Sequence, residues 1–472
     1  MIKNTFLYIV AGIFSQLMMF VLWLVLPFFL TSVDIAIYTN YLYYIELFSA
    51  FVIVGGDSIL VRYYYSEYSK ESIFSQIIFT TLVASAALYV VSIIGTYFGL
   101  IDFKQSPKWL IYIFPVIVFF NATASLILIH FSANREAAKY SLVQFAKIIV
   151  FISIAILFSY LNLRSEGLVF ALALSCMLVI VYFIKTQRYS IAKFRFRKDF
   201  MREPFEYGYP MMFYSIVGVI SLYASRLFLQ KNLSLESVGV FSFFLVIVYQ
   251  FNGLFSSFNK AWTPEVYAKL ENGGSKDFLA NSAFSIVFLY LTFLLLGALI
   301  GNFFIFDHIF RPEYLKQIHV FLILLTFPLF AGVYTVYYPL FYLENKTKDI
   351  LVISIINSSA NILLLYFFIQ SFGVNGAAIG TVINSVLGLI VYLIYFRKIV
   401  NLSPKMIFWL SSLSFGAILL SVLVIHTKQL TFFYLILLSL MILTFKLGGL
   451  RKVGRDLFLT ILSKMKYRKQ LA

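Results

Sequence analysis

The chain contains a long succession of apolar runs, each about as long as a helix that crosses a membrane. A bilayer core roughly 30 Å thick requires about 20 apolar helical residues. By this measure the sequence predicts about fourteen spans, at 6–30, 38–61, 74–99, 109–131, 141–161, 166–185, 208–230, 236–258, 279–305, 316–340, 349–370, 374–396, 406–425 and 430–447. Backbone polar groups find no water partner in lipid, so such segments are expected to be helices. We therefore predict an all-α integral membrane protein.

The composition excludes a water-soluble protein. Hydrophobic residues make up 61% of the chain and charged residues only 12%, whereas about a quarter of the residues of soluble domains are charged. A soluble core could not bury so much apolar surface. The composition therefore supports the membrane assignment independently of the length of the runs.

The lysines and arginines predict the orientation in the membrane. Cytoplasmic loops retain positive charge, and placing the N-terminus in the cytoplasm puts most of the 37 basic residues in cytoplasmic segments. Both termini are then cytoplasmic. The formal net charge of +17 is explained by this asymmetry and by attraction to anionic inner-leaflet lipid, so no nucleic-acid partner is expected.

A basic segment at mid-chain predicts two lobes. It separates two stretches that share landmarks at similar spacing, Asn134 with Asn345 and Gly167 with Gly376, which favours a parallel repeat with the site between the lobes. The expected domains are a six-helix lobe, a basic cytoplasmic linker, a second six-helix lobe, two extra helices and a basic cytoplasmic tail, at 1–185, 186–207, 208–396, 397–447 and 448–472.

Motifs of soluble enzymes are missing from the sequence. It contains no phosphate-binding G-x-x-x-x-G-K-[ST] loop and no H-E-x-x-H or paired-cysteine metal pattern. His308 and His319 lack a third ligand, so a metal site is not expected. We therefore expect neither a cofactor nor an enzymatic activity.

The informative residues are the ionisable ones inside the predicted spans. Arg226, Lys147 and Glu46 lie within spans, where a charge costs several kcal/mol unless it faces a cavity or a partner. For Arg226 and Lys147 we favour a water-filled lumen over snorkelling. Two cations of this kind suit an anionic cargo such as a pyrophosphate, because Arg and Lys form charge-assisted hydrogen bonds with phosphate.

Three further ionisable residues mark the cytoplasmic ends of spans. Asp57 and Arg62 end the second span and Lys260 ends the eighth. Snorkelling to the interface is the favoured interpretation for Arg62 and Lys260. An intramembrane carboxylate can titrate, so Glu46 is a candidate for coupling to H+ or Na+.

Six blocks, in order along the chain, resemble the recurring segments of bacterial polysaccharide flippases of the Wzx type. They are GGDSILVRYYYSE at 55–67, YGYP at 207–210, SRLFL at 225–229, VGVFS at 238–242, AWTPEVY at 261–267 and GVNGAA at 373–378. Many relatives carry an aspartate immediately before the arginine of the third block, where this chain has Ser225.

The resemblance implies the fold of the multidrug/oligosaccharidyl-lipid/polysaccharide exporter superfamily, with two six-helix lobes around a central cavity and two extra C-terminal helices. It also implies flipping of undecaprenyl-pyrophosphate-linked oligosaccharide repeat units across the bacterial inner membrane for O-antigen, lipopolysaccharide or capsule synthesis. A polysaccharide polymerase and glycosyltransferases are possible partners, together with membrane lipid and a coupling ion.

The leading hypothesis assigns roles to the residues singled out above. Arg226, Lys147 and Arg62 would bind substrate, while Glu46, Asp57 and Lys260 would serve coupling or gating. Two alternatives stay open. A cation-coupled multidrug exporter of the same fold would be expected to have mainly acids in its lumen, and a non-transporting scaffold for glycosyltransferases would use the basic tail as a docking surface.

Overall fold

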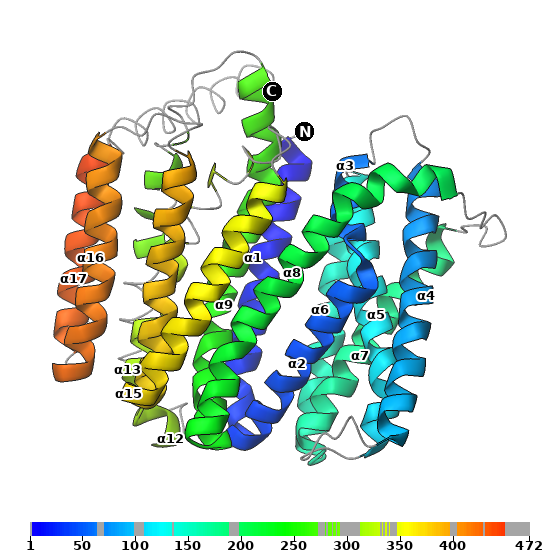
Figure 1. Ribbon diagram of the computed structural model, residues 1–472, viewed down its shortest axis with the longest axis horizontal. Helices are drawn as coiled ribbons and strands as arrows, with labels where there is room; N and C mark the ends of the chain where they lie inside the picture. Colours follow the sequence, from blue (N-terminus) through cyan, green and yellow to red (C-terminus); the bar gives the residue numbers. More distant parts are fainter. Residues whose placement is uncertain are drawn as a thin grey trace, which may run out of the picture. The chain divides into compact units, whose positions relative to one another are not determined.

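The computed structural model describes residues 2–63, 70–98, 108–134, 136–187, 198–271, 312–330, 347–396, 404–427 and 430–448, with scattered positions in 279–292 and 333–339. Every regular element in these ranges is a helix (Figure 1). They are α1 (Ile2–Val25), the 3-10 helix η1 (Leu26–Phe28), α2 (Ser32–Ile53), α3 (Gly56–Tyr63), α4 (Lys70–Tyr97), α5 (Lys108–Ala133), α6 (Ala137–Tyr160), α7 (Arg164–Gln187), α8 (Lys198–Asn232), α9 (Leu235–Glu271), α12 (Pro312–Leu315), α13 (Ile318–Leu324), α15 (Thr347–Phe396), α16 (Pro404–Thr427) and α17 (Leu430–Gly448).

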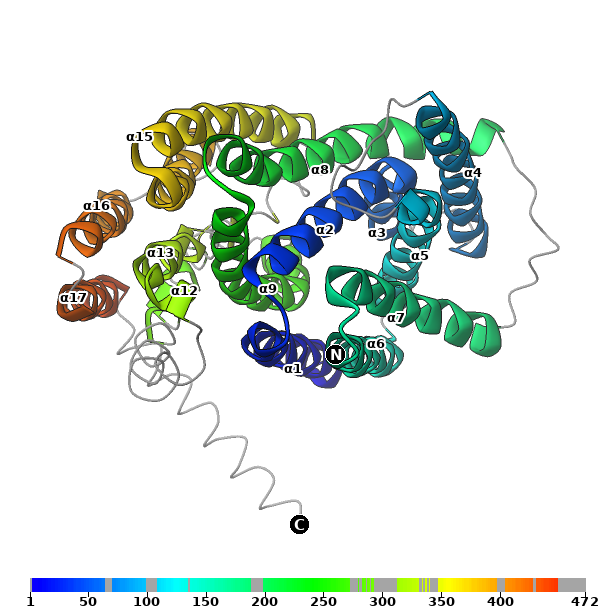
Figure 2. The same ribbon diagram turned by 90° about the horizontal axis from the view of Figure 1, so that it is seen from below.

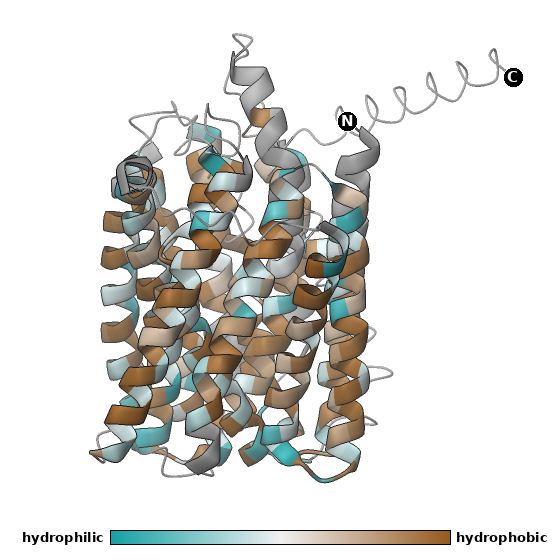
Figure 3. Cartoon of the chain, turned by 90° about the vertical axis from the view of Figure 1, so that its right-hand side faces the viewer, coloured by the Kyte–Doolittle hydropathy of each residue, from teal (hydrophilic) through white to brown (hydrophobic). Residues whose placement is uncertain are grey.

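The helices confirm the all-α membrane class. Within the described residues, six helices are long and apolar enough to cross a bilayer, and a seventh span results when α2 and α3 are taken together. Figure 3 shows hydrophobic residues, in brown, along the length of these helices. The predicted spans at 349–370 and 374–396 both lie in α15, whose helical geometry is interrupted at Gly373 (φ 58°, ψ −130°). Most of the span expected at 279–305 lies outside the described residues.

The second predicted span is bent. A capping box starts α2, in which Asp34 N–H donates to Thr31 Oγ1 (3.2 Å) and Thr31 N–H donates to Asp34 Oδ2 (3.0 Å). The helix ends at Ile53, and the two residues that follow, Val54 and Gly55, have positive φ angles of 54° and 72°. The chain then continues as α3 at an angle of 51° to α2. The span expected at 38–61 is therefore found as a bent pair of helices.

The capping box supports a small stability prediction. Replacing Thr31 by alanine removes the side-chain acceptor for the Asp34 N–H, and such a loss typically costs about 1 kcal/mol. We expect the Thr31→Ala protein to unfold at a correspondingly lower denaturant concentration in detergent micelles. Thr186→Ala is the matched control, because the exposed Thr186 hydroxyl donates to the carbonyls of Tyr182 and Phe183 within its own helix. Equal stability of the two variants would contradict the capping role.

The chain divides into two compact units. Unit 1 comprises residues 1–261 and 344–377, and unit 2 comprises 262–343 and 378–472. In unit 1, α6 packs against α1 and α7, α5 against α4 and α7, and α2 against α5 and α8. The first part of α15 joins unit 1 where Asn361 Nδ2 donates to both the backbone oxygen (3.0 Å) and the hydroxyl (2.9 Å) of Ser221 on α8. The two six-helix lobes expected at 1–185 and 208–396 stay a prediction.

Unit 2 contains the two additional C-terminal helices. The spans predicted at 406–425 and 430–447 are α16 and α17, which pack against each other. Their contact includes a hydrogen bond from Trp409 Nε1 to Thr444 Oγ1 (3.0 Å). Trp409 also lies against Phe284, with ring centroids 4.2 Å apart. A buried indole N–H usually has a hydrogen-bond partner, and here that partner connects α16 to α17.

Candidate functional site

A polar cavity of 460 Å³ lies inside unit 1. Its walls come from α1, α2, α6, α7, α8 and α9. Figure 2 shows these helices from below. Hydroxyl, amide and charged side chains contribute much of the lining, namely Ser15, Gln16, Tyr38, Thr39, Tyr43, Glu46, Gln144, Lys147, Ser175, Tyr249 and Gln250. A cavity with convergent polar groups among membrane-crossing helices is the expected setting for a polar cargo.

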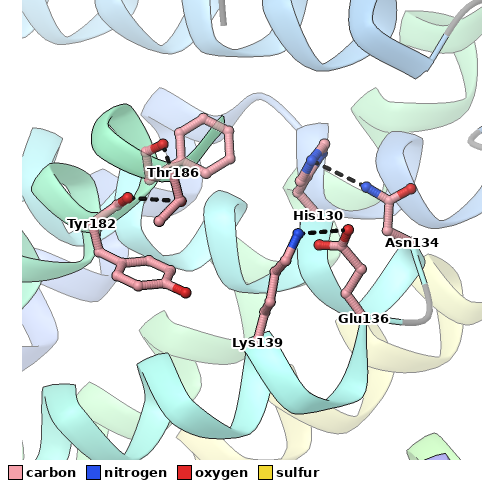
Figure 4. A network of polar contacts seen from close by, with 7 residues as sticks. His130, Asn134, Glu136, Lys139, Tyr182 and Thr186 are labelled. Atoms are coloured by element: carbon pink, nitrogen blue, oxygen red, sulfur yellow. Dashed lines mark hydrogen bonds and ion pairs between the residues drawn. The ribbon is translucent and has the colours of Figure 1, made fainter. Parts of the chain in front are cut away.

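Glu46 and Lys147 bring opposite charges to this cavity from α2 and α6. The Glu46 side chain is exposed and that of Lys147 is partly exposed, so both open into the cavity rather than pack against protein. Among the described residues, the recorded ion pair is a different one, between Lys139 Nζ and Glu136 Oε1 at 3.0 Å (Figure 4). Within the part of the chain that the structure describes, Glu46 and Lys147 thus form no ion pair, and their charges face the cavity.

Arg226 lies behind the wall of the cavity. It is fully buried on α8, with its guanidinium carbon 3.8 Å from the centre of the Tyr43 ring. Nη1 donates to the Leu222 carbonyl (3.3 Å), whereas Nε and Nη2 have no hydrogen-bond partner in the described part of the chain. Glu46 and Arg226 still interact electrostatically. A buried cation with free donors is costly, and stacking on an aromatic face recovers only part of that cost.

Tyr43 therefore separates the buried Arg226 from the polar cavity. The sequence predicted that Arg226 and Lys147 would both face a water-filled lumen. Lys147 does line the cavity, but Arg226 does not. Ser225, which stands where many relatives have an aspartate, donates to the Leu222 carbonyl (3.1 Å) of its own helix. It thus supplies Arg226 with no counter-charge.

An apolar pocket of 310 Å³ lies on the other side of Tyr43. Its lining carries no charged side chain and comes from α2, α8 and the first part of α15: Tyr43, Tyr44, Leu47, Val219, Ile220, Tyr223, Ala224, Leu227, Phe228 and Ile362. The hydroxyls of Tyr44 and Tyr223 are 2.7 Å apart and hydrogen-bond to each other. This pairing satisfies polar atoms that would otherwise lie in an apolar setting.

Arg62 and Asp57 belong to a separate cluster on α3. The Arg62 side chain is exposed, with its guanidinium carbon 4.2 Å from the Tyr207 ring of α8 and 5.6 Å from the Tyr63 ring. Asp57 Oδ1 accepts from the Ser58 N–H (2.8 Å). Neither residue lines the polar cavity. In Figure 1, α3 and the first turns of α8 lie at the same end of unit 1 as the start of α1.

The remaining candidates are placed as follows. Lys260 lies on α9, but its side chain is outside what the structure describes. Within the described residues, no group of three or more His, Cys, Asp or Glu could hold a metal ion.

Tyr43 was missed by the sequence analysis, although it lies one helical turn from Glu46 and shares its face. A tyrosine three residues before an acid inside a predicted span could have identified Tyr43 as a candidate site residue.

Comparison with known proteins gives a family match and a fold. A family model described as "Polysaccharide biosynthesis protein" matches residues 1–271. No curated protein sequence matches this chain. A structure of the lipid II flippase MurJ, in an inward closed conformation, aligns with a TM-score of 0.58 and 17% identity, over 97% of this chain and 99% of that one.

Two MATE structures share the fold as well. The MATE multidrug transporter DinF-BH has a TM-score of 0.62 and 16% identity, and a MATE protein in complex with MaL6 has 0.60 and 14%. Each alignment covers 84% of this chain and 95% of the other. At such identities the likeness is one of fold, and it agrees with the exporter architecture expected from the sequence.

Proposed function

Because the chain belongs to the polysaccharide biosynthesis protein family, we propose that it flips undecaprenyl-pyrophosphate-linked oligosaccharide repeat units from the cytoplasmic to the outer face of the plasma membrane. The observation that carries the proposal is a polar cavity among membrane-crossing helices, with Lys147 on its wall and the free donors of Arg226 behind one tyrosine ring. The likeness in fold to a lipid II flippase supports the same class of cargo.

The proposed site binds the two parts of the head group differently. Lys147 and Arg226 would hold the diphosphate, Arg226 after the Tyr43 ring moves aside, because guanidinium and ammonium groups form strong hydrogen bonds to phosphate oxygens. The hydroxyls and amides of Thr39, Ser175 and Gln250 would contact sugar hydroxyls. Transport would follow alternating access, in which the site opens to each side of the membrane in turn.

The other candidate residues have proposed roles around this site. Arg62, exposed at the end of α3, would meet the diphosphate on its way in. Glu46 would couple transport to H+ or Na+, since an intramembrane carboxylate can exchange protons or bind a cation. Asp57 and Lys260 would act in gating. No covalent bond is made or broken in this scheme, so the protein would not be an enzyme and would need no cofactor.

The cellular setting follows from the same proposal. The protein would span the inner membrane with both termini in the cytoplasm and serve O-antigen, lipopolysaccharide or capsule synthesis. A polymerase and glycosyltransferases would act on the same lipid-linked repeat unit before and after it crosses. The basic linker and tail would contact anionic lipid on the cytoplasmic surface.

Removing the charge of Lys147 tests the site. A hydrogen bond to a charged group contributes about 1.5–3 kcal/mol, so we expect Lys147→Gln to reduce flipping of a lipid-linked oligosaccharide into proteoliposomes about tenfold or more. The matched control is Lys185→Gln, because Lys185 is exposed at the end of α7. In cells lacking the protein, lipid-linked repeat units should accumulate on the cytoplasmic leaflet. Full complementation by Lys147→Gln would remove Lys147 from the site.

A multidrug exporter is the second candidate function, and the Glu46 carboxylate in a cavity with aromatic walls favours it. Such a cavity would suit an organic cation, and the MATE proteins of similar fold are multidrug transporters. The two functions predict different phenotypes. Changed resistance to cationic drugs with normal surface polysaccharide would support the exporter, whereas loss of surface polysaccharide with unchanged resistance would support the flippase.

A further inference from the structure

The apolar pocket described above borders the polar cavity through a single shared side chain. Tyr43 contributes to the lining of both spaces. The polar cavity carries two charged side chains, whereas the walls of the apolar pocket are aliphatic and aromatic with only the paired tyrosine hydroxyls. A molecule that filled both spaces would need a polar end and a hydrocarbon end joined at Tyr43.

The position of the apolar pocket makes it accessible from lipid. It lies on α8 and α15, which are long and apolar enough to cross a bilayer, and on α2, which is so together with α3. Two of its residues on α8, Ile220 and Leu227, are 46% and 49% exposed. Large apolar side chains exposed on a membrane-crossing helix are expected to face hydrocarbon, because lipid tails are as apolar as they are. The pocket volume of 310 Å³ lies at the lower end of the range for ligand sites.

We propose that this pocket holds the first part of the polyisoprenyl chain of the cargo while the diphosphate and sugars occupy the polar cavity. The inference rests on the proposed flippase function and adds a site for the lipid. A lipid-linked head group cannot enter the cavity unless its chain stays in apolar surroundings next to it. Among the described residues, the apolar pocket shares a wall with the cavity and provides those surroundings.

Tyr43 has a defined role in this arrangement. Its ring lies over Arg226, its side chain borders both spaces, and its neighbour Tyr44 pairs with Tyr223 at the rim of the pocket. The diphosphate, which joins the chain to the sugars, would therefore lie at Tyr43. Displacement of the ring by the diphosphate would expose the free Nε and Nη2 donors of Arg226 at the junction between head and chain.

Photocrosslinking tests the location of the chain. The probe is a polyisoprenyl diphosphate oligosaccharide with a photoreactive group in the isoprene unit next to the diphosphate, added to the full-length protein in lipid nanodiscs. We expect labelling of peptides that contain residues 43–47 or 219–228. Unlabelled polyisoprenyl diphosphate oligosaccharide should compete, and excess phosphatidylglycerol should not. Labelling confined to other helices, or equal competition by phosphatidylglycerol, would overturn the inference and in the second case indicate ordinary membrane lipid.

A pair of tryptophan substitutions provides the matched control. Leu227→Trp fills the pocket, and Leu157→Trp adds the same side chain to α6 at a residue of similar exposure (52%) outside both spaces. We expect Leu227→Trp to lower labelling and flipping at least fivefold, and Leu157→Trp to change neither by more than twofold. Folding of both variants is checked by their elution from size-exclusion chromatography.

The transport result separates the two proposals. If the wild-type protein flips no lipid-linked oligosaccharide, the proposed function fails. If the wild type flips it and a well-folded Leu227→Trp protein does so equally well, the function stands and the apolar pocket is not the site of the chain. If Leu227→Trp misfolds, Ala224→Val narrows the same pocket with two methyl groups, and undiminished labelling of that variant overturns the inference.

Discussion

Replacing Arg226 by methionine is expected to lower flipping at least tenfold while leaving the protein as stable as the wild type or more so. The guanidinium is fully buried and only Nη1 has a hydrogen-bond partner among the described residues. Replacing a buried, poorly paired charge with an apolar side chain of similar volume is often neutral or stabilising, by about 1–4 kcal/mol. The two donors left free would serve the diphosphate, at about 1.5–3 kcal/mol for each charged hydrogen bond.

The measurement combines flipping in proteoliposomes with the free energy of unfolding in detergent micelles. Lys231→Met is the matched control, since Lys231 is exposed in the last turn of the same helix and the substitution removes the same charge. Arg226→Lys should retain less than half of the activity, because an ammonium cannot bind phosphate in the bidentate way that a guanidinium does. Wild-type flipping by a folded Arg226→Met protein would exclude a direct role for this residue in transport.

Replacing Gly55 by alanine is expected to cost about 3 kcal/mol or more in stability. Gly55 has a φ of 72°, and an added Cβ would lie 2.1 Å from the backbone oxygen of Gly208 on α8. Left-handed backbone costs an ordinary residue about 1–2 kcal/mol, and overpacking adds about 1–3 kcal/mol. Because two backbones meet here, neither can relieve the clash by rotating a side chain. The bend between α2 and α3 would have to change.

Gly218 provides the control for this prediction. It lies on α8, and nothing is found within 4 Å of a Cβ added there. Alanine in a helix interior is favoured over glycine by about 0.5–1 kcal/mol, so Gly218→Ala should be neutral or slightly stabilising. Denaturant unfolding of both variants in the same detergent gives the comparison. Equal stabilities would show that the close contact between Gly55 and Gly208 does not exist in the folded protein.

Much of the fold follows from the length of the apolar runs. Span length depends on bilayer thickness and helical rise, which are the same for every protein, so the spans ending near Tyr160 and beginning near Asp349 are found from sequence alone. The break expected between 370 and 374 coincides with the kink at Gly373. The bend after Val54 was not predicted, because a left-handed valine has no sequence signal.

The site was only partly predictable. Charged residues inside apolar runs are rare enough to be noticed, which identified Glu46, Lys147 and Arg226. Their grouping depends on how each helix is rotated about its axis, and in lipid the outward face is as apolar as the packed one. The sequence therefore could not tell that Lys147 opens into a cavity whereas Arg226 is sealed behind Tyr43. The sequence also could not tell that Arg62 lies apart from Lys147 and Arg226, against the Tyr207 ring.

The opposite charges of Glu46 and Lys147 on the cavity wall have an energetic consequence for export. When both side chains are ionised, their formal charges cancel, and the charged residues of the lining add no net charge to whatever the cavity holds. The charge that crosses the electric field is then that of the cargo together with that of any coupling ion. Across a membrane whose interior is negative, each negative charge moved outward releases about 2.3 kcal/mol per 100 mV. Under the proposed function, a cavity with a neutral wall would thus allow the membrane voltage to drive a diphosphate outward and to oppose its return.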